Sequence, residues 1–265
     1  MMLKIFTMLK NSFLSILAIL ALCVLTACNG DDYKPGGKKS TPEDDINAFL
    51  IAHYTFDSGN ALDMSGNGWD GVVFNNAGFI SDTPSGTGSA LFLNGIKEQY
   101  VNIPYNMFAG LLEYTISLWV KDFSTGALVS GISSQFEVYC VPRVYLKDDG
   151  TLSFETGYND VRSSQAFAYN CSSIQSGSWH HIAVTVARDN STNYSYLRKL
   201  YIDGILTDSI QDYSKDNAGY VTKFNIGGNG NGFYPVFQSM KVDNVSFFSA
   251  ALKGTVVKYL YDNKF

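Results

Sequence analysis

Charged residues are scarce in this chain of 265 residues. Asp, Glu, Lys and Arg together make up 16% of it, against roughly a quarter in average globular proteins. Acidic residues outnumber basic ones, and the formal net charge is -5. The chain lacks the excess of Lys and Arg on which phosphate binding depends, so we expect no nucleic-acid partner. Aromatic residues make up 14%, which excludes disorder over most of the chain.

The apolar run near the start is too short for a membrane-spanning helix. It covers Phe13–Leu25 and follows Lys4 and Lys10, whereas a spanning helix needs about 20 apolar residues. A basic start followed by a short apolar run is typical of an export signal. We therefore predict that residues 1–27 form a signal peptide.

Leu25–Cys28 resembles the lipobox of bacterial lipoproteins. The resemblance implies cleavage before Cys28, lipidation of Cys28 and contact with the membrane through the lipid alone. The alternative is an ordinary signal peptide with a chance cysteine. Asn29–Asp32 resembles the surface-export signal of Bacteroidetes lipoproteins, which implies an outer-membrane protein at the cell surface; an orientation toward the periplasm is the alternative.

Residues 28–45 are polar and contain Pro35, Gly36, Gly37 and Pro42. Apolar residues do not recur there at a helical or strand period, so we expect a flexible tether. The rest of the chain, residues 46–265, is long enough to form one all-β domain.

From residue 46 onward, short alternating runs are separated by Gly, Asn and Asp. Ile116, Leu118 and Val120 share one face of a run, and the Asp203-Gly204 dipeptide predicts a hairpin turn. The best helical candidate, Thr255–Tyr261, is short. Many short strands at this spacing predict an all-β fold, an antiparallel β-sandwich of the jelly-roll type.

Eight motifs in order resemble the laminin-G-like jelly rolls of the concanavalin A-like lectin/glucanase superfamily. They are Ala52–Asp57, Asp63–Gly68, Gly88–Gly95, Tyr114–Lys121, Ser178–Val184, Leu200–Gly204, Phe224–Gly228 and Val242–Val245. The superfamily holds lectins, carbohydrate-binding modules, adhesins and some glycosidases. The resemblance therefore implies a fold without fixing a function.

The sequence lacks the acidic triplet Glu-x-Asp-x-x-Glu that the glucanases of this superfamily carry on one strand. Glu137 has no partner acid nearby, and Glu155 and Asp160 have a spacing that suits a loop. A faint likeness of Phe154–Asp160 to an alginate-lyase strand lacks its lysine. We therefore predict no enzyme, with a diverged glycoside hydrolase or polysaccharide lyase as the least favoured alternative.

The chain has three histidines, at 53, 180 and 181, and no Gly-x-Ser-x-Gly elbow. His180 is in phase with Ile182 and Val184, so we expect it in or near the core. His181 shares the other face with Trp179. Adjacent histidines on a strand point apart, which argues against a zinc site.

Asp243 is in phase with Val245 and Phe247, which should face the core, and a buried carboxylate needs a partner or a metal. The laminin-G resemblance implies structural calcium where the first and last strands lie side by side. We carry this over to Asp57, Asp63 and Asp243. In the alternative, Asp57 and Asp63 only cap turns and Asp243 binds backbone amides.

Four cysteines are present; Cys23 leaves with the signal peptide and Cys28 takes the lipid. Cys140 and Cys171 remain in an exported, oxidising setting, so we predict a disulfide between them. Two buried free thiols are the alternative.

Sugar binding by β-sandwiches uses exposed aromatic rings together with Asn, Asp and Gly. Two stretches have this composition, and most of their rings could equally serve in packing. The candidate ligand residues are Tyr158, Asn159, Arg162, Tyr169, Asn231, Phe233 and Tyr234.

Together these observations predict a lipid-anchored carbohydrate-binding module without catalysis, whose partner is a glycan or glycoconjugate. A protein-binding adhesin or assembly subunit is the alternative.

Overall fold

The computed structural model describes residues 39–132, 142–155, 167, 169–189, 195–212, 221–228 and 237–265. Ser40–Phe265 form one compact unit. Its helices are α2 (Pro42–Phe49) and α3 (Gly254–Asp262), with single 3-10 turns η1 (Gly95–Lys97) and η2 (Cys171–Ser173). Its strands are β1 (Leu50–Tyr54), β2 (Val72–Phe74), β3 (Gly78–Ile80), β4 (Ala90–Leu93), β5 (Tyr100–Ile103), β6 (Tyr114–Lys121), β7 (Gly126–Ile132), β8 (Arg143–Leu146), β9 (Leu152–Glu155), β10 (His180–Asp189), β11 (Ser195–Ile202), β12 (Ile205–Asp212), β13 (Lys223–Ile226) and β14 (Met240–Phe248).

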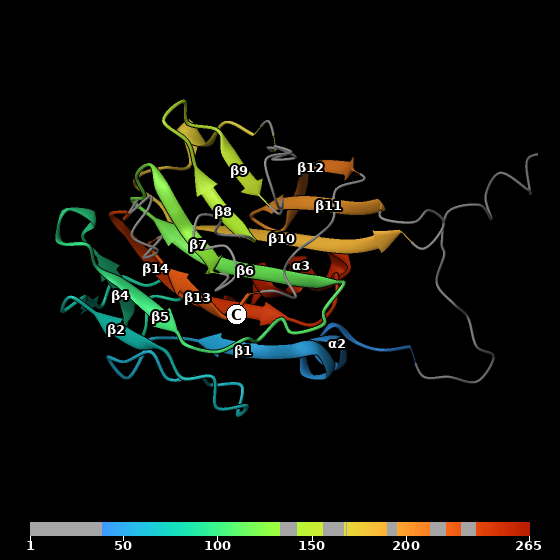
Figure 1. Ribbon diagram of the computed structural model, residues 1–265, viewed down its shortest axis with the longest axis horizontal. Coiled ribbons are helices and arrows are strands. Elements are labelled where there is room, and N and C mark those ends of the chain that lie inside the picture. Colours follow the sequence, from blue (N-terminus) through green and yellow to red (C-terminus); the bar gives the residue numbers. More distant parts are fainter. Residues whose placement is uncertain are drawn as a thin grey trace, which may run out of the picture. The chain divides into compact units, whose positions relative to one another are not determined.

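The strands form two antiparallel sheets (Figure 1). The eight-stranded sheet has the order β12-β11-β10-β6-β14-β4-β3, and β1 also pairs with β14. The six-stranded sheet has the order β2-β5-β13-β7-β8-β9. Neighbouring strands are mostly distant in sequence, as in β14 between β6 and β4. The predicted all-β sandwich is confirmed.

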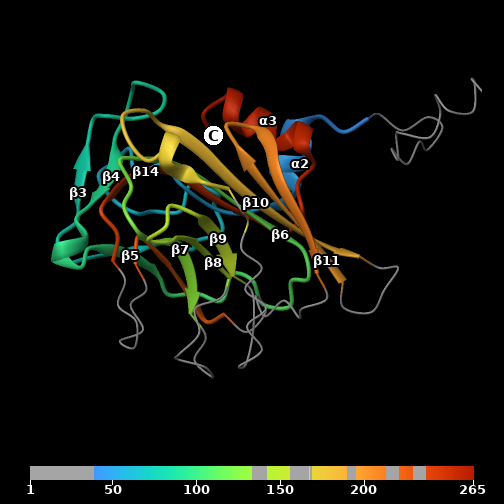
Figure 2. The same cartoon turned by 90° about the horizontal axis from the view of Figure 1, so that it is seen from above.

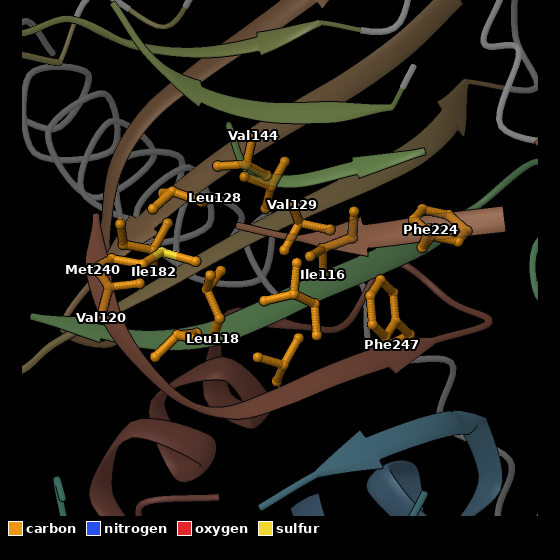
Figure 3. Packing of buried hydrophobic residues seen from close by; sticks show 14 of the residues in the cluster. Ile116, Leu118, Val120, Leu128, Val129, Val144, Ile182, Phe224, Met240 and Phe247 are labelled. Carbon is orange, nitrogen blue, oxygen red and sulfur yellow. The ribbon is translucent and has the colours of Figure 1, made fainter. Parts of the chain in front are cut away.

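The main core lies between the two sheets and follows from strand alternation. Ile116, Leu118 and Val120 of β6 are fully buried and point toward Val129 and Phe224 of the other sheet (Figure 3). Because successive side chains of a strand point to opposite faces, the residues between these belong to the outer surface or to a second layer. Apolar burial on this scale is the main source of stability for such a fold.

A second core lies on the outer face of the eight-stranded sheet. Helices α2 and α3 lie together on this side (Figure 2). Their apolar side chains pack against residues of β10, β11 and β14, among them Ala183, Tyr201 and Phe248. The amphipathic segment predicted at Thr255–Tyr261 is thus confirmed as α3, and its apolar stripe is what covers the sheet.

Helix α2 includes residues 42–45, which the sequence composition predicts to be part of a flexible tether. Thr41 caps it: its hydroxyl accepts from the Asp44 amide, and the Asp44 carboxylate accepts from the Thr41 amide. This reciprocal capping box and Pro42 at the first turn start the helix. The domain boundary expected at residue 46 therefore falls inside α2. In this segment the capping residues, and not a periodic pattern of apolar residues, mark the start of the helix in the sequence.

The hairpin turn predicted at Asp203-Gly204 is confirmed. Asp203 and Gly204 join β11 to β12 with positive φ angles of 51° and 74°, as a two-residue hairpin turn requires. Gly150 lies in the turn between β8 and β9 with φ of 80°.

Burial of the adjacent histidines is the reverse of what strand phase predicts. His181 is fully buried beneath the helical layer, where its ring lies beside Trp119 and Tyr261 and its Nε2 contacts the Ser117 hydroxyl at 2.8 Å. His180 is only half-buried and contacts Asp203. The expectation fails because α3 covers the outer face, while His180 lies at the end of the strand.

A core substitution tests the packing between the sheets. Phe247 is fully buried, and its ring centre lies 5.2 Å from that of Phe224 and 5.9 Å from that of Phe108. We expect Phe247→Ala to lower the free energy of unfolding by about 3–5 kcal/mol in urea denaturation, because it leaves a cavity. Ile205→Ala, at a site 65% exposed, should cost about 0.5 kcal/mol or less. Equal losses would contradict this assignment of the core.

The burial of His181 predicts a pH dependence of stability. Burial lowers the pKa of His181 from 6.5 to about 3, so the unfolded state takes up the proton first as the pH falls. The contribution of His181 to stability should therefore decline as the pH drops below about 6.5, by up to about 1.4 kcal/mol per pH unit. His181→Gln should remove this contribution to the slope of unfolding free energy between pH 6.5 and 5, while the other buried titratable groups, His53 and Asp243, keep theirs. Ile205→Ala, which removes an exposed uncharged group, is the control and should keep the wild-type slope; a wild-type slope in His181→Gln would refute the role of His181.

Candidate functional site

Two acids converge where two strands meet end to end. β1 and β4 both pair with the same side of β14: Tyr54 lies opposite Val245, and Leu91 lies opposite Val242. The residues of β14 between these pairs are Asp243 and Asn244, where the register shifts. Asn244 has a φ of 47°, as a bulge of this kind requires. Asp243 therefore faces the junction between the end of β1 and the start of β4.

Asp57 reaches this junction from the chain that follows β1. Its Oδ1 accepts a hydrogen bond from the Ser89 amide at 3.0 Å. A Cβ added to Gly88 would lie 1.8 Å from that oxygen, and Gly88 has a φ of 82°. Only glycine fits there, both for space and for backbone conformation. The backbone before β4 is thus built to approach the Asp57 carboxylate.

Asp243 is 3% exposed. Burial raises the pKa of its carboxyl to about 8, and the charge of Asp57 raises it further, while the Asn244 amide opposes the shift. The ionised form of Asp243 therefore lacks the nearby positive charge that would stabilise a buried carboxylate. Strand phase predicted this burial for the wrong reason: the bulge places Asp243 opposite Trp119 and out of phase with Val245, so alternation does not direct it to the main core.

The donor set at this junction suits a hard cation. The described residues contain no group of three or more His, Cys, Asp or Glu that could hold a metal ion. A cation here would bind the carboxylates of Asp57 and Asp243 together with backbone carbonyls, and oxygen ligands of this kind fit Ca²⁺.

Asp63 has a different role. Its Oδ1 accepts from the amides of His53 and Ser65, and its Oδ2 accepts from the Trp69 amide and the Ser65 hydroxyl. These contacts order the loop that follows β1, which matches the turn-capping alternative for this residue. Of the three predicted ligands, Asp63 is thus the one whose two oxygens are already engaged by this loop.

The three histidines make contacts within the fold. His53 is buried; its Nδ1 lies 2.8 Å from the Ser246 hydroxyl, and its ring stacks on Phe265 at 4.4 Å. Burial lowers its pKa to about 4. His180 Nδ1 lies 2.8 Å from Asp203, and His181 contacts Ser117. Each ring is thus engaged by a neighbour that positions it.

Most of the predicted ligand residues lie outside the described residues: Tyr158, Asn159, Arg162, Asn231, Phe233 and Tyr234. Tyr169 is described; it is half-buried and packs against the main core. Its ring therefore has a packing role, whatever else it contacts.

The predicted disulfide stays a prediction, because Cys140 also lies outside the described residues. Cys171 is fully buried, and in the reduced state burial raises the pKa of its thiol to about 12. Cys28 is likewise not described. Within the described segments, neither helix combines the length and apolar character needed to cross a bilayer.

One cluster was missed by the sequence reasoning. Asp82, in the chain between β3 and β4, binds Lys121 of β6 and Lys241 of β14, at 2.9 and 2.8 Å. It also accepts from the indole N–H of Trp179 at 3.0 Å. Asp122 binds Lys241 at 2.8 Å and accepts from the Gly177 amide.

Charge pairing fixes the ionisation of this cluster. Hydrogen bonds from Lys241 and Lys121 hold the pKa of Asp82 well below its usual range. The Asp122 and Asp82 carboxylates raise the pKa of Lys241. A pattern search could not find the cluster, because its members come from four segments far apart in the sequence.

Comparison with known proteins agrees with this architecture. A family model described as laminin-G-like, of the concanavalin A-like lectin/glucanases superfamily, matches residues 93–258. No curated protein matches the chain. Domain 4 of AbnA, a GH43 extracellular arabinanase from Geobacillus stearothermophilus, was solved with arabinotriose. It is 22% identical, with a TM-score of 0.56 over 80% of this chain and 98% of that domain.

Two toxin domains share the fold. The binding domain of botulinum neurotoxin DC, solved with SialylT, is 15% identical with a TM-score of 0.59, covering 82% of this chain and 52% of that one. The binding domain of Paraclostridial Mosquitocidal Protein 1 is 19% identical with a TM-score of 0.57, covering 83% and 53%. This chain thus spans about half of each toxin domain. The family match covers more than half of this chain, which belongs to the laminin-G-like domains of the concanavalin A-like lectin/glucanases superfamily.

Proposed function

We propose that this protein is a non-catalytic carbohydrate-binding module that a lipid on Cys28 anchors at the bacterial cell surface. The observation that carries the proposal is that aromatic rings lie at the surface beside polar groups in fixed positions. Phe92 is 39% exposed on the outer face of β4, and Trp179 is half-buried with its N–H held by Asp82. Sugars bind through such rings and such polar groups.

Similar proteins support a binding role. The AbnA domain was solved with arabinotriose and the neurotoxin DC domain with SialylT. Their identities to this chain are low, so their ligands guide the choice of probes and do not name the ligand here. The reaction chemistry of a glycosidase would need two carboxyl groups flanking a bound sugar. Among described residues, the exposed Asp57 and the buried Asp243 lie at a strand junction instead.

A protein partner is the second candidate. Ile205 and Leu206 are 65% and 51% exposed at the start of β12, the edge strand of the eight-stranded sheet. Unpaired edge strands with exposed apolar residues favour protein contacts. The neurotoxin DC binding domain was also solved with rat synaptotagmin II.

We further propose that Asp57 and Asp243 hold a structural Ca²⁺. The ion would supply the positive charge that the buried Asp243 lacks and would join the end of β1 to the start of β4. The Gly88–Asp57 contact supports this, because it brings backbone to within reach of the same carboxylate.

Glycan binding is tested on an array with the purified full chain, in the presence of Ca²⁺ and then of a chelator. We expect selective binding to a small set of glycans and no release of reducing sugar or unsaturated product from the glycans that bind. A blank array with folded protein would overturn the carbohydrate proposal in favour of a protein partner. Turnover of a bound glycan would overturn the non-catalytic assignment.

Calcium binding is tested by thermal unfolding. An ion present at 100 times its dissociation constant stabilises by about 2.7 kcal/mol, so a chelator should lower Tm by several degrees. Asp243→Asn should abolish this response to Ca²⁺. Asp149→Asn changes an exposed turn acid and should keep the full response. If the Tm of the wild type changes neither with Ca²⁺ nor with chelator, the site is refuted.

A further inference from the structure

The outer face of the eight-stranded sheet is only partly covered. The row through Trp119 and His181 lies beneath Tyr261 and Lys264. The next row along the strands carries Phe92 on β4, Lys241 on β14 and Lys121 on β6, which lie directly opposite one another. Trp179 continues the row, because it precedes His180, the partner of Val120. Each of these side chains is partly exposed.

We call this row, with Asp82 and Asp122, the Phe92–Trp179 surface. Four adjacent strands at about 4.8 Å spacing place its two rings about 14 Å apart along the row. Gly78 lies opposite Phe92 on β3 and has no side chain to cover the ring. The surface therefore has an aromatic ring at each end and charged groups between them.

The charged groups are held in place, and some of them keep hydrogen-bonding capacity for a ligand. Asp82 accepts from Lys121 and Trp179 through Oδ1 and from both lysines through Oδ2, which uses the four acceptor positions of a carboxylate. Asp122, at 41% side-chain exposure, accepts one contact at each oxygen. Its remaining lone pairs, and lysine N–H groups, remain for a ligand.

Stability alone does not explain this arrangement. Exposed ion pairs contribute roughly 0–1 kcal/mol each, and Asp82 is 37% exposed. What the network does achieve is to fix two ammonium groups, two carboxylates and the plane of an indole ring before anything binds. Preorganisation of this kind raises affinity because little further ordering is needed.

Resting on the proposed function, we propose that the Phe92–Trp179 surface is the glycan site and that it binds a neutral, extended glycan lying across the four strands. The rings would stack on sugars at either end, and the charged groups between them would bind hydroxyls. The surface holds two lysines and two aspartates, each lysine already paired with a carboxylate. Its charges balance, so it offers no net attraction to uronic or sulfated chains.

The test uses the full chain and six polysaccharides: linear arabinan, xylan, mannan and β-glucan as neutral probes, and polygalacturonate and heparin as charged ones. For the neutral probe that binds, Phe92→Ala and Trp179→Ala should each weaken affinity about tenfold. Phe74→Ala is the matched control: it removes the same ring at 38% exposure from the outer face of the other sheet and should bind like the wild type. Asp82→Asn should weaken binding with little change in Tm, as expected for a positioning residue.

A measurement on the wild type avoids dependence on folded variants. Lys121 and Lys241 should react more slowly with acetic anhydride when the neutral polysaccharide is bound, as read by mass spectrometry. Lys253, exposed before α3, should react at an unchanged rate.

The outcomes separate the two proposals. Unchanged affinity in Phe92→Ala and Trp179→Ala, or unchanged acetylation of Lys121 and Lys241 in the complex, would overturn this site while carbohydrate binding stands. Binding to polygalacturonate or heparin alone would overturn the neutral class. Binding to none of the probes or array glycans would overturn the proposed function itself.

Discussion

Strand β14 is the element on which both candidate sites depend. It is the neighbour of β6 on one side, while β1 and β4 share its other side. Two strands that share one edge leave a break in the hydrogen-bonded ladder between them, and the bulge at Asp243 and Asn244 occupies that break. The same strand carries Lys241 two residues earlier, in the row with Phe92 and Lys121. One extended segment thus positions a buried acid and a surface cation.

The two faces of the eight-stranded sheet differ because the helices cover only part of the outer one. Where α3 and the residues after it lie, the sheet presents Trp119, Ala183 and His181, and these become a second core. Beyond the helical layer, the same strands present charged and aromatic residues. The position of α3 along the strands therefore decides which outer residues are buried and which meet solvent. This explains why His181 is buried and Lys121 is not, although both belong to outward-facing positions.

The parts of the fold governed by local rules could be predicted. Alternation of apolar and polar residues predicted β6 and β10, and the Asp-Gly dipeptide predicted the β11–β12 turn. The helical period of apolar residues predicted α3. The two candidate sites depend on pairing between strands far apart in the sequence, so only some of their residues could be predicted. Asp57 and Asp243 were named from the resemblance to laminin-G-like domains, and the structure brings both to the junction of β1 and β4. Asp82, Lys121, Lys241 and Trp179 could not be predicted, since nothing local indicates that a residue between β3 and β4 reaches across two other strands.

The bulge also explains how a carboxylate comes to be buried in an otherwise regular strand. Val242 and Val245 both point into the core, which strict alternation forbids for residues three apart. The positive φ of Asn244 takes up the extra residue, and its side-chain amide donates to the Lys264 carbonyl at 2.6 Å, tying the bulge to the chain after α3. A regular strand would place either Asp243 or Val245 on the wrong face. The local distortion thus satisfies two demands at once: apolar packing on the core side, and an acid directed at the junction of β1 and β4.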